Sequence, residues 1–114
     1  MTGQLPVSQD VLAVIQRSLL GVTASPAGTA YEAFKGLELP VAGKTGTAES
    51  GQEEPHAWFA GYAPYDDPEI VVVSFVYNGR EGSTVSGPIV RKIIDAYFEL
   101  KQIDTELEGL NAVK

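Results

Sequence analysis

The chain has 114 residues, enough for one compact domain, and its 44% apolar and 20% charged content indicates a globular protein, not a disordered tail or a coiled coil. The net charge is −7, from 8 Lys and Arg against 15 Asp and Glu, so no nucleic-acid partner is expected. The sequence has no cysteine and a single histidine, His56, so neither a disulfide nor a metal site is expected. It has no apolar run of about 18 residues and no signal-like start, so neither a membrane span nor a signal peptide is expected.

An amphipathic helix over residues 8–20 is the first predicted element. Apolar residues follow at helical spacing behind Ser8, whose hydroxyl can cap the first turn, and Gly21 is placed to end the helix. Residues 23–30 are rich in Ser, Thr, Pro and Gly and favour a loop. Residues 31–37 are expected to form a short turn or helix before the sheet begins.

Three strands are predicted next, at residues 41–48, 57–63 and 70–77, and the short polar turns between them indicate an antiparallel meander. A glycine-rich loop at 78–83 then leads to a helix over residues 88–101, whose broad apolar face should pack on the sheet. The last dozen residues form either a helical extension or a frayed tail. The predicted fold is therefore α/β, of the α+β type: a three-stranded antiparallel sheet with a helix at each end of the chain.

A Lys-Thr-Gly triplet at residues 44–46 is the motif that carries chemistry. This triplet is one of the active-site motifs of serine β-lactamases and penicillin-binding proteins. Its context is longer, with Gly-Lys-Thr-Gly-Thr-Ala-Glu at 43–49 and His-Ala-Trp-Phe-Ala-Gly-Tyr-Ala-Pro at 56–64, followed by a Val-rich strand and a terminal helix. From about residue 8 to residue 100, this order of elements resembles the C-terminal part of the transpeptidase domain of a class B penicillin-binding protein.

The resemblance implies a D,D-transpeptidase that cross-links peptidoglycan stem peptides by serine acyl transfer and is inhibited by β-lactams. Lys44 can supply positive charge and Thr45 a hydroxyl hydrogen bond to the carboxylate of a peptide ending in D-Ala-D-Ala. Gly46 can leave the strand bare so that the substrate backbone lies alongside it. By the same resemblance, Thr47 contributes its backbone amide to the oxyanion hole. Lys44 and Thr47 are thus the expected catalytic residues, all four bind substrate, and no cofactor is expected.

The resemblance also implies a division of the chain and a cellular place. Residues 1–102 are expected to be the C-terminal portion of a transpeptidase domain whose full sheet has five strands, and residues 103–114 a tail. No serine is followed by lysine three places on or by asparagine two places on, so the nucleophile is expected to lie elsewhere and the chain alone to be inactive. The family works in the cell envelope, at the extracytoplasmic face of the bacterial inner membrane, with an anchor outside these residues.

Other functions remain open at this point. A related serine D,D-carboxypeptidase, a β-lactamase, or a β-lactam-binding sensor without turnover would carry the same triplet, and the triplet can also occur by chance in an unrelated fold. A phosphate-binding loop is disfavoured because it needs a glycine five places before Gly43, where Glu38 stands, and a helix directly after.

Several chemistry-bearing side chains have simpler interpretations. His56 is more often a structural residue at such a strand start than a catalytic base. The carboxylates at 53–54 and 66–67 are expected in solvated turns, while Arg80 and Ser83 could line the rim of a groove. The aromatic residues are expected in the core and on the sheet faces, not in a ligand cage: Trp58, Phe59, Tyr62, Phe75 and Tyr77.

The strand at 70–77 is expected to form an open, Val-rich edge. In the family it pairs on one side with the aromatic strand and on the other with an N-terminal strand that this sequence does not contain, and open edges favour association. The family also packs an N-terminal helix beside the terminal helix, so Ile94, Tyr97 or Phe98 are expected to be partly exposed. The expected ligands are therefore the stem peptide and β-lactams. The expected protein partner is either the N-terminal part of the domain or a second copy that pairs through residues 70–77, and the chain is expected to be ordered only with one of these two.

Overall fold

The structure is a computed structural model that describes residues 3–51 and 53–112. Its elements in chain order are α1 (Gln9–Ala24), α2 (Tyr31–Phe34), β1 (Ala42–Ala48), β2 (His56–Ala63), β3 (Ile70–Val76), the π-helical turn η1 (Gly82–Ser86) and α3 (Gly87–Ala112). The strands form one antiparallel sheet in the order β1-β2-β3. The predicted three-stranded antiparallel sheet with flanking helices is confirmed.

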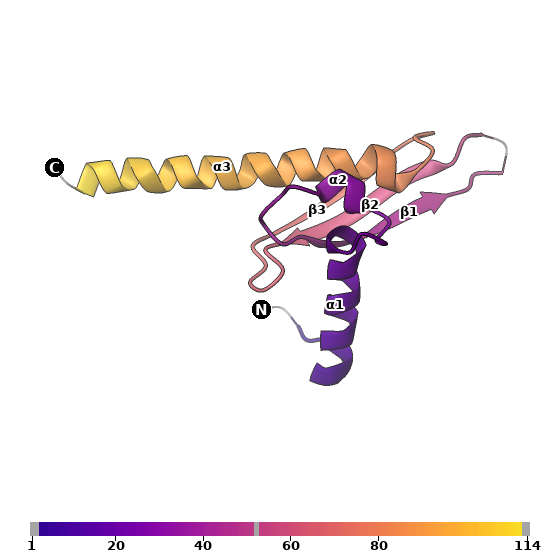
Figure 1. Ribbon diagram of the computed structural model, residues 1–114, viewed down its shortest axis with the longest axis horizontal. Helices are drawn as coiled ribbons and strands as arrows, with labels where there is room; N and C mark the ends of the chain where they lie inside the picture. Colours follow the sequence, from indigo (N-terminus) through magenta and orange to yellow (C-terminus); the bar gives the residue numbers. More distant parts are fainter. Residues whose placement is uncertain (1–2, 52, 113–114) are drawn as a thin grey trace.

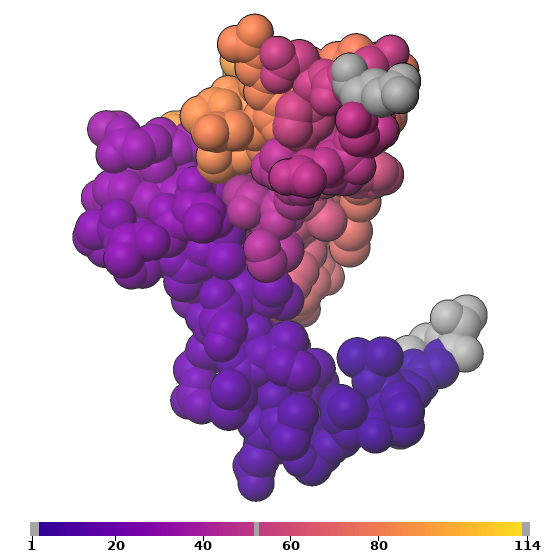
Figure 2. Space-filling view, turned by 90° about the vertical axis from the view of Figure 1, so that its right-hand side faces the viewer, coloured from indigo at the N-terminus to yellow at the C-terminus, as the bar shows by residue number. Residues whose placement is uncertain are grey.

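The helices are placed unequally around this sheet. Figure 1 shows α3 and α2 over one face, while α1 runs crosswise to α3 and away from the sheet. In Figure 2, the N-terminal part of the chain forms a lobe that stands off from the body. None of the helices in the described part of the chain is both long and apolar enough to span a membrane.

The core lies between the sheet and the helices α2 and α3, and Phe59 is at its centre. The buried cluster comprises Ala30, Phe34, Val41, Phe59, Ala63, Val72, Val90 and Ile94. Two glycines leave room for the Phe59 ring, because a Cβ at Gly43 would lie 2.6 Å from it and a Cβ at Gly61 would lie 2.8 Å from it. Gly43 is therefore explained by packing inside the protein, where the Phe59 ring covers the main chain of β1.

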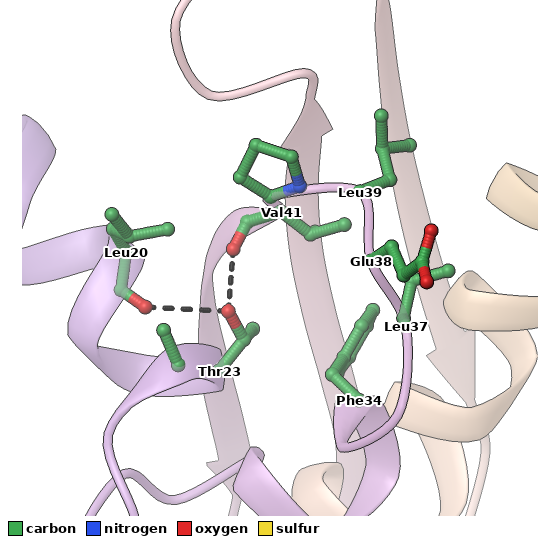
Figure 3. Close-up of a pocket in the computed structure, with 9 residues that line it drawn as sticks. Leu20, Thr23, Phe34, Leu37, Glu38, Leu39 and Val41 are labelled. Carbon is green, nitrogen blue, oxygen red and sulfur yellow. Dashed lines mark hydrogen bonds between the residues drawn. The ribbon is translucent and has the colours of Figure 1, made fainter.

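The first helix extends beyond its predicted end. It continues through Gly21 to Ala24, and the last turn is held by contacts from distant residues. The Thr23 hydroxyl is buried and donates to the carbonyl oxygen of Val41, as Figure 3 shows. A Cβ at Gly28 would lie 2.3 Å from the carbonyl oxygen of Gly21, so the following loop turns tightly against this last turn. These contacts fix the end of α1 to the start of β1.

The last helix begins one residue before its predicted start and continues far past its predicted end at residue 101, reaching Ala112. Of the two alternatives for the last dozen residues, the described part forms a helical extension. The expected exposure of Ile94 is wrong: this side chain is fully buried, one turn after Val90, because both face the sheet. Tyr97 is exposed and Phe98 is half-buried, as expected.

Residues 1–2, 52 and 113–114, which the predicted domain, turn and tail include, lie outside the described residues.

Candidate functional site

The Lys-Thr-Gly-Thr segment lies in the middle of β1, which has β2 as its only neighbouring strand among the described residues. The register pairs Lys44 with Ala60 and Gly46 with Trp58 on the open face of the sheet. Thr45 and Thr47 alternate with them and belong to the opposite face, where η1 lies against β1 and where α2 and α3 pack on the rest of the sheet. The four predicted site residues are thus consecutive along an edge strand but point to two different sides.

Lys44 is exposed, and its ammonium group folds back along the strand. The Nζ atom donates to the carbonyl oxygen of Thr45 at 2.8 Å. Beside it lies an apolar cavity of about 200 Å³, lined in part by Leu19, Tyr62 and Val71. The Tyr62 hydroxyl is buried without a hydrogen-bond partner in the described part of the chain, and burial raises the pKa of the Tyr62 phenol. A cationic group therefore borders an apolar hollow on the open face.

Thr45 and Thr47 are linked to different loops. The Oγ1 atoms of Thr45 and Thr29 lie 2.9 Å apart in a hydrogen bond, which connects β1 to the loop that follows α1. The Thr47 hydroxyl oxygen accepts a longer hydrogen bond, 3.5 Å, from the backbone N–H of Gly82 in η1. Sequence reasoning missed Thr29, because nothing local connects it to a strand that begins a dozen residues later.

The short turn η1 presses directly on the main chain beneath this segment. A Cβ at Gly82 would lie 2.3 Å from the carbonyl oxygen of Trp58 and 2.5 Å from that of Gly46. The buried Ser86 hydroxyl donates to the carbonyl oxygen of Ala57 at 2.9 Å and anchors the same turn. The glycine-rich composition of residues 78–83 was the only sequence signal for this close approach.

Gly46 has a packing partner that the sequence did not suggest. A Cβ at this position would lie 3.1 Å from the Cβ of Trp58, its cross-strand neighbour. The missing side chain therefore faces the open side of the sheet, the side that also holds Lys44. Because Lys44 and Thr45 point to opposite faces, a ligand that contacts both must lie along the edge of β1 and not on either face.

His56 belongs to a separate cluster at the end of the sheet. Its Nδ1 atom accepts from the backbone N–H of Asn78 at 3.0 Å, and its ring stacks on Tyr77 with 4.6 Å between ring centroids. The Tyr77 hydroxyl donates to Glu53 Oε2 at 2.6 Å and is the main cause that lowers the pKa of the Glu53 carboxyl. These contacts favour the structural interpretation of His56. Nearby, Arg80 Nε and Glu54 Oε2 lie 3.7 Å apart in an ion pair, and both side chains are exposed.

The cavity between the helices and the acidic groups offer little chemistry. A cavity of about 260 Å³ lies between α1, α2 and the start of β1, and Figure 3 shows its mostly apolar lining around Leu20, Phe34 and Leu39. Glu38 is the one charged residue in that lining. Among the described residues, no three His, Asp or Glu side chains are grouped so that they could hold a metal ion.

Comparison with known proteins agrees with this fold. Residues 1–95 match the family described as the penicillin binding protein transpeptidase domain. The chain is 34% identical over 98 residues to the peptidoglycan D,D-transpeptidase MrdA of Haemophilus influenzae, a match that covers 73% of this chain and 15% of that relative. It thus spans less than a fifth of the length of that curated relative.

Solved structures give the same result. The structure of Pseudomonas aeruginosa PBP2 in complex with WCK 5153 has a TM-score of 0.72 at 31% identity, covering 83% of this chain and 24% of that one. The imipenem acyl-enzyme complex of penicillin-binding protein A from M. tuberculosis has a TM-score of 0.65 at 33% identity, and the match covers 84% of this chain and 21% of that chain. The chain belongs to the family of penicillin-binding protein transpeptidase domains.

Proposed function

We propose that this chain is the part of a peptidoglycan D,D-transpeptidase that binds the donor stem peptide, and that β1 is its binding strand. The observation that carries the proposal is the Lys-Thr-Gly-Thr segment on an edge strand of a family member. In an antiparallel ladder, alternate residues of an edge strand direct their N–H and C=O groups away from the neighbouring strand. A peptide in extended conformation can therefore pair with β1 as an additional strand.

The four residues take different roles along this edge. Lys44 and the Thr45 hydroxyl flank the strand from opposite faces and contribute charge and a hydrogen bond to the terminal carboxylate of D-Ala-D-Ala. Gly46 adds no side chain beside them, so the substrate backbone can lie alongside the strand. The backbone amide of Thr47 serves the oxyanion hole, where a fixed donor stabilises the charge that develops when a serine attacks the amide. β-Lactams bind in the same place because they present a comparable carboxylate and a strained amide.

Two supports for Thr45 and Thr47 lie on other elements. The Thr29 hydroxyl orients that of Thr45, and the Gly82 N–H approaches the hydroxyl of Thr47. Both contacts hold side chains on the covered face, so the rotamers at the edge are set before a ligand arrives. We include Thr29 and Gly82 as positioning residues of the proposed binding strand.

The proposal extends to the whole chain and its surroundings. Residues 1–102 form the C-terminal portion of the transpeptidase domain and residues 103–114 a tail. The enzyme acts in the cell envelope, at the extracytoplasmic face of the bacterial inner membrane. Its N-terminal part supplies the attacking serine and pairs with the open edge of β3.

A chimera tests the proposal without requiring a longer version of this chain. Residues 1–95 replace the matching segment of Haemophilus influenzae MrdA, and covalent labelling by a fluorescent penicillin is followed over time. We expect a label that persists, and a Lys44→Ala variant that is labelled roughly 100-fold more slowly. Lys92→Ala removes an exposed lysine from α3 and should be labelled at the parental rate.

The outcomes separate the candidate functions. A chimera that melts cooperatively but takes up no label contradicts the proposal, as does equal labelling of the Lys44→Ala and Lys92→Ala variants. Rapid release of the label identifies a β-lactamase instead. A persistent label without cross-linking of a stem peptide and an acceptor amine favours the sensor, and release of D-Ala to water favours the carboxypeptidase.

A further inference from the structure

A second apolar stripe runs along α3, on a different side from the residues that pack on the sheet. Val90 and Ile94 fill the core, whereas a set of exposed apolar residues recurs at alternating spacings of four and three. These residues, which we call the outer stripe, are Ile89, Ile93, Ala96, Leu100, Ile103, Leu107 and Leu110. That spacing is the heptad repeat through which one helix packs against another.

The distal half of the outer stripe has no neighbour in the described part of the chain. Figure 1 shows α3 continuing well beyond the sheet toward the C-terminus. Leu100, Leu107 and Leu110 are 62%, 53% and 65% exposed. Among the described residues, the ion pair between Lys101 and Glu69, in the turn before β3, is the last hydrogen bond or ion pair that joins α3 to the rest of the chain. A helical segment of this length is marginal in water, so its stability depends on what covers the stripe.

The charges beside the stripe indicate what can cover it. Glu99, Asp104 and Glu106 occupy the positions that flank its distal half. If two copies paired in parallel, Glu99 of one would face Asp104 of the other, and if they paired antiparallel along the whole stripe, Glu99 would face Glu106. Like charges in these positions disfavour pairing, and each copy carries a net charge of −7. A second copy is therefore a poor match for this surface.

We propose that the outer stripe from Leu100 to Leu110 is a docking surface for one amphipathic helix of a protein partner, with Lys or Arg residues beside its own apolar stripe. The partner helix covers the exposed leucines by helix-to-helix packing. Its cations meet Glu99, Asp104 and Glu106, which set its register and orientation. The proposal is independent of the transpeptidase proposal, because the family match ends at residue 95.

Two designed peptides of about 28 residues test this surface. Both carry the same Leu and Ile stripe, with Lys at the flanking positions in one and Glu in the other. Binding of each fluorescent peptide to the full 114-residue chain is measured by anisotropy. We expect the basic peptide to bind roughly tenfold more tightly than the acidic one, with a difference that shrinks as salt is added.

Variants locate the contact. Leu107→Gln removes one exposed leucine from the stripe and should lower the affinity for the basic peptide by about tenfold. Thr105→Gln, at an exposed position on the opposite side of the same segment, should leave the affinity unchanged. Glu99→Lys combined with Glu106→Lys should transfer the preference to the acidic peptide. Circular dichroism of each variant verifies that the helix content is retained.

Three results would overturn the proposal. The first is equal binding of the two peptides, or binding of neither. The second is an affinity that Leu107→Gln leaves unchanged. The third is a dimer in sedimentation experiments that Leu107→Gln dissociates, because this result would assign the outer stripe to a second copy of the chain.

Discussion

Trp58 and Phe59 are consecutive aromatic residues of β2, yet they lie on opposite sides of the sheet in different surroundings. Phe59 is 0% exposed, stacks on Phe34 with 5.3 Å between ring centroids, and fills the space left by two glycines. Trp58 is 41% exposed and contacts Phe75 across the strands at 4.5 Å. One face of the sheet is packed by the chain itself, and the other is an apolar surface that solvent reaches.

This difference separates the residues that hold the fold from those that are available for contacts. The covered face carries the cluster around Phe59 and the two buried hydroxyls of Thr23 and Ser86, each with a backbone acceptor. The open face carries Lys44 and a row of exposed apolar residues that includes Val71, which is 72% exposed. An exposed row of this kind is typical of interaction surfaces, and it adjoins the edge of β3, which has no neighbouring strand among the described residues.

The largest expected effect is on the covered face. Phe59→Ala should lower the free energy of unfolding by about 3–5 kcal/mol, because it leaves a cavity between the sheet and two helices. Trp58→Ala, its neighbour on the open face, should cost about 1 kcal/mol through the lost contact with Phe75. Urea titration followed by circular dichroism measures both. Equal costs would mean that the two faces do not differ in the way described above.

A pair of glycines gives the next largest effect. Gly82→Ala should destabilise the protein by about 1–3 kcal/mol, since the new Cβ would collide with backbone oxygens that cannot move independently. Gly21→Ala is the matched control: its Cβ meets no atom within 4 Å, and alanine should stabilise the interior of α1 by about 0.5–1 kcal/mol. Opposite signs in the two thermal melts are the expected outcome, and a neutral Gly82→Ala would show that η1 is not pressed against the sheet.

Lys44 should matter little for the fold. Because its side chain is exposed and donates a hydrogen bond only to the neighbouring residue, Lys44→Ala should change the free energy of unfolding by less than about 0.5 kcal/mol. A larger loss in the same urea titration would place Lys44 among the residues that stabilise the sheet. Thr45→Val is a useful companion, since it removes the hydrogen bond to Thr29 while keeping the shape of the side chain.

The smallest expected effect is a pH dependence at the end of the sheet. The Tyr77 hydroxyl lowers the pKa of the Glu53 carboxyl, so this contact stabilises the fold above the usual titration range of a glutamate and is lost as the pH falls through the lowered value. Tyr77→Phe should therefore raise the pKa of Glu53, as measured by carboxyl chemical shifts. The stability difference between the parent and this variant should shrink in acid. An unchanged Glu53 titration would show that the hydrogen bond does not form in solution.

The sequence predicted the sheet well because its signals are local. Strand boundaries agree to within one residue, since β-branched and aromatic runs end at turns rich in Gly, Pro and Asp. The helix that continues past Gly21 and the turn η1 were not predicted, because both depend on residues far along the chain that hold them in place. Ile94 was misjudged for a similar reason: its burial follows from the sheet of this chain alone and needs no additional helix.

The candidate site was predicted as a segment but not as an arrangement. The Lys-Thr-Gly triplet and its context located the strand, and the family match agrees with that resemblance. That Lys44 and Thr45 point to opposite faces follows from strand alternation alone. The hydroxyl pair of Thr45 and Thr29 required the structure, because it depends on how the loop after α1 folds back onto β1. The chemical roles of Lys44, Thr45, Gly46 and Thr47 remain predictions for the variants to test.

The length of α3 has a consequence for how many molecules the protein can hold at once. A helix rises about 1.5 Å per residue, so the segment after Lys101 extends about 16 Å beyond the ion pair with Glu69. Figure 1 shows this segment pointing away from β1, at the far end of a molecule 62 Å long. A helix docked on the tip, as proposed above, would leave the edge of β1 unobstructed, so the proposed peptide and the proposed protein partner would bind simultaneously without steric conflict.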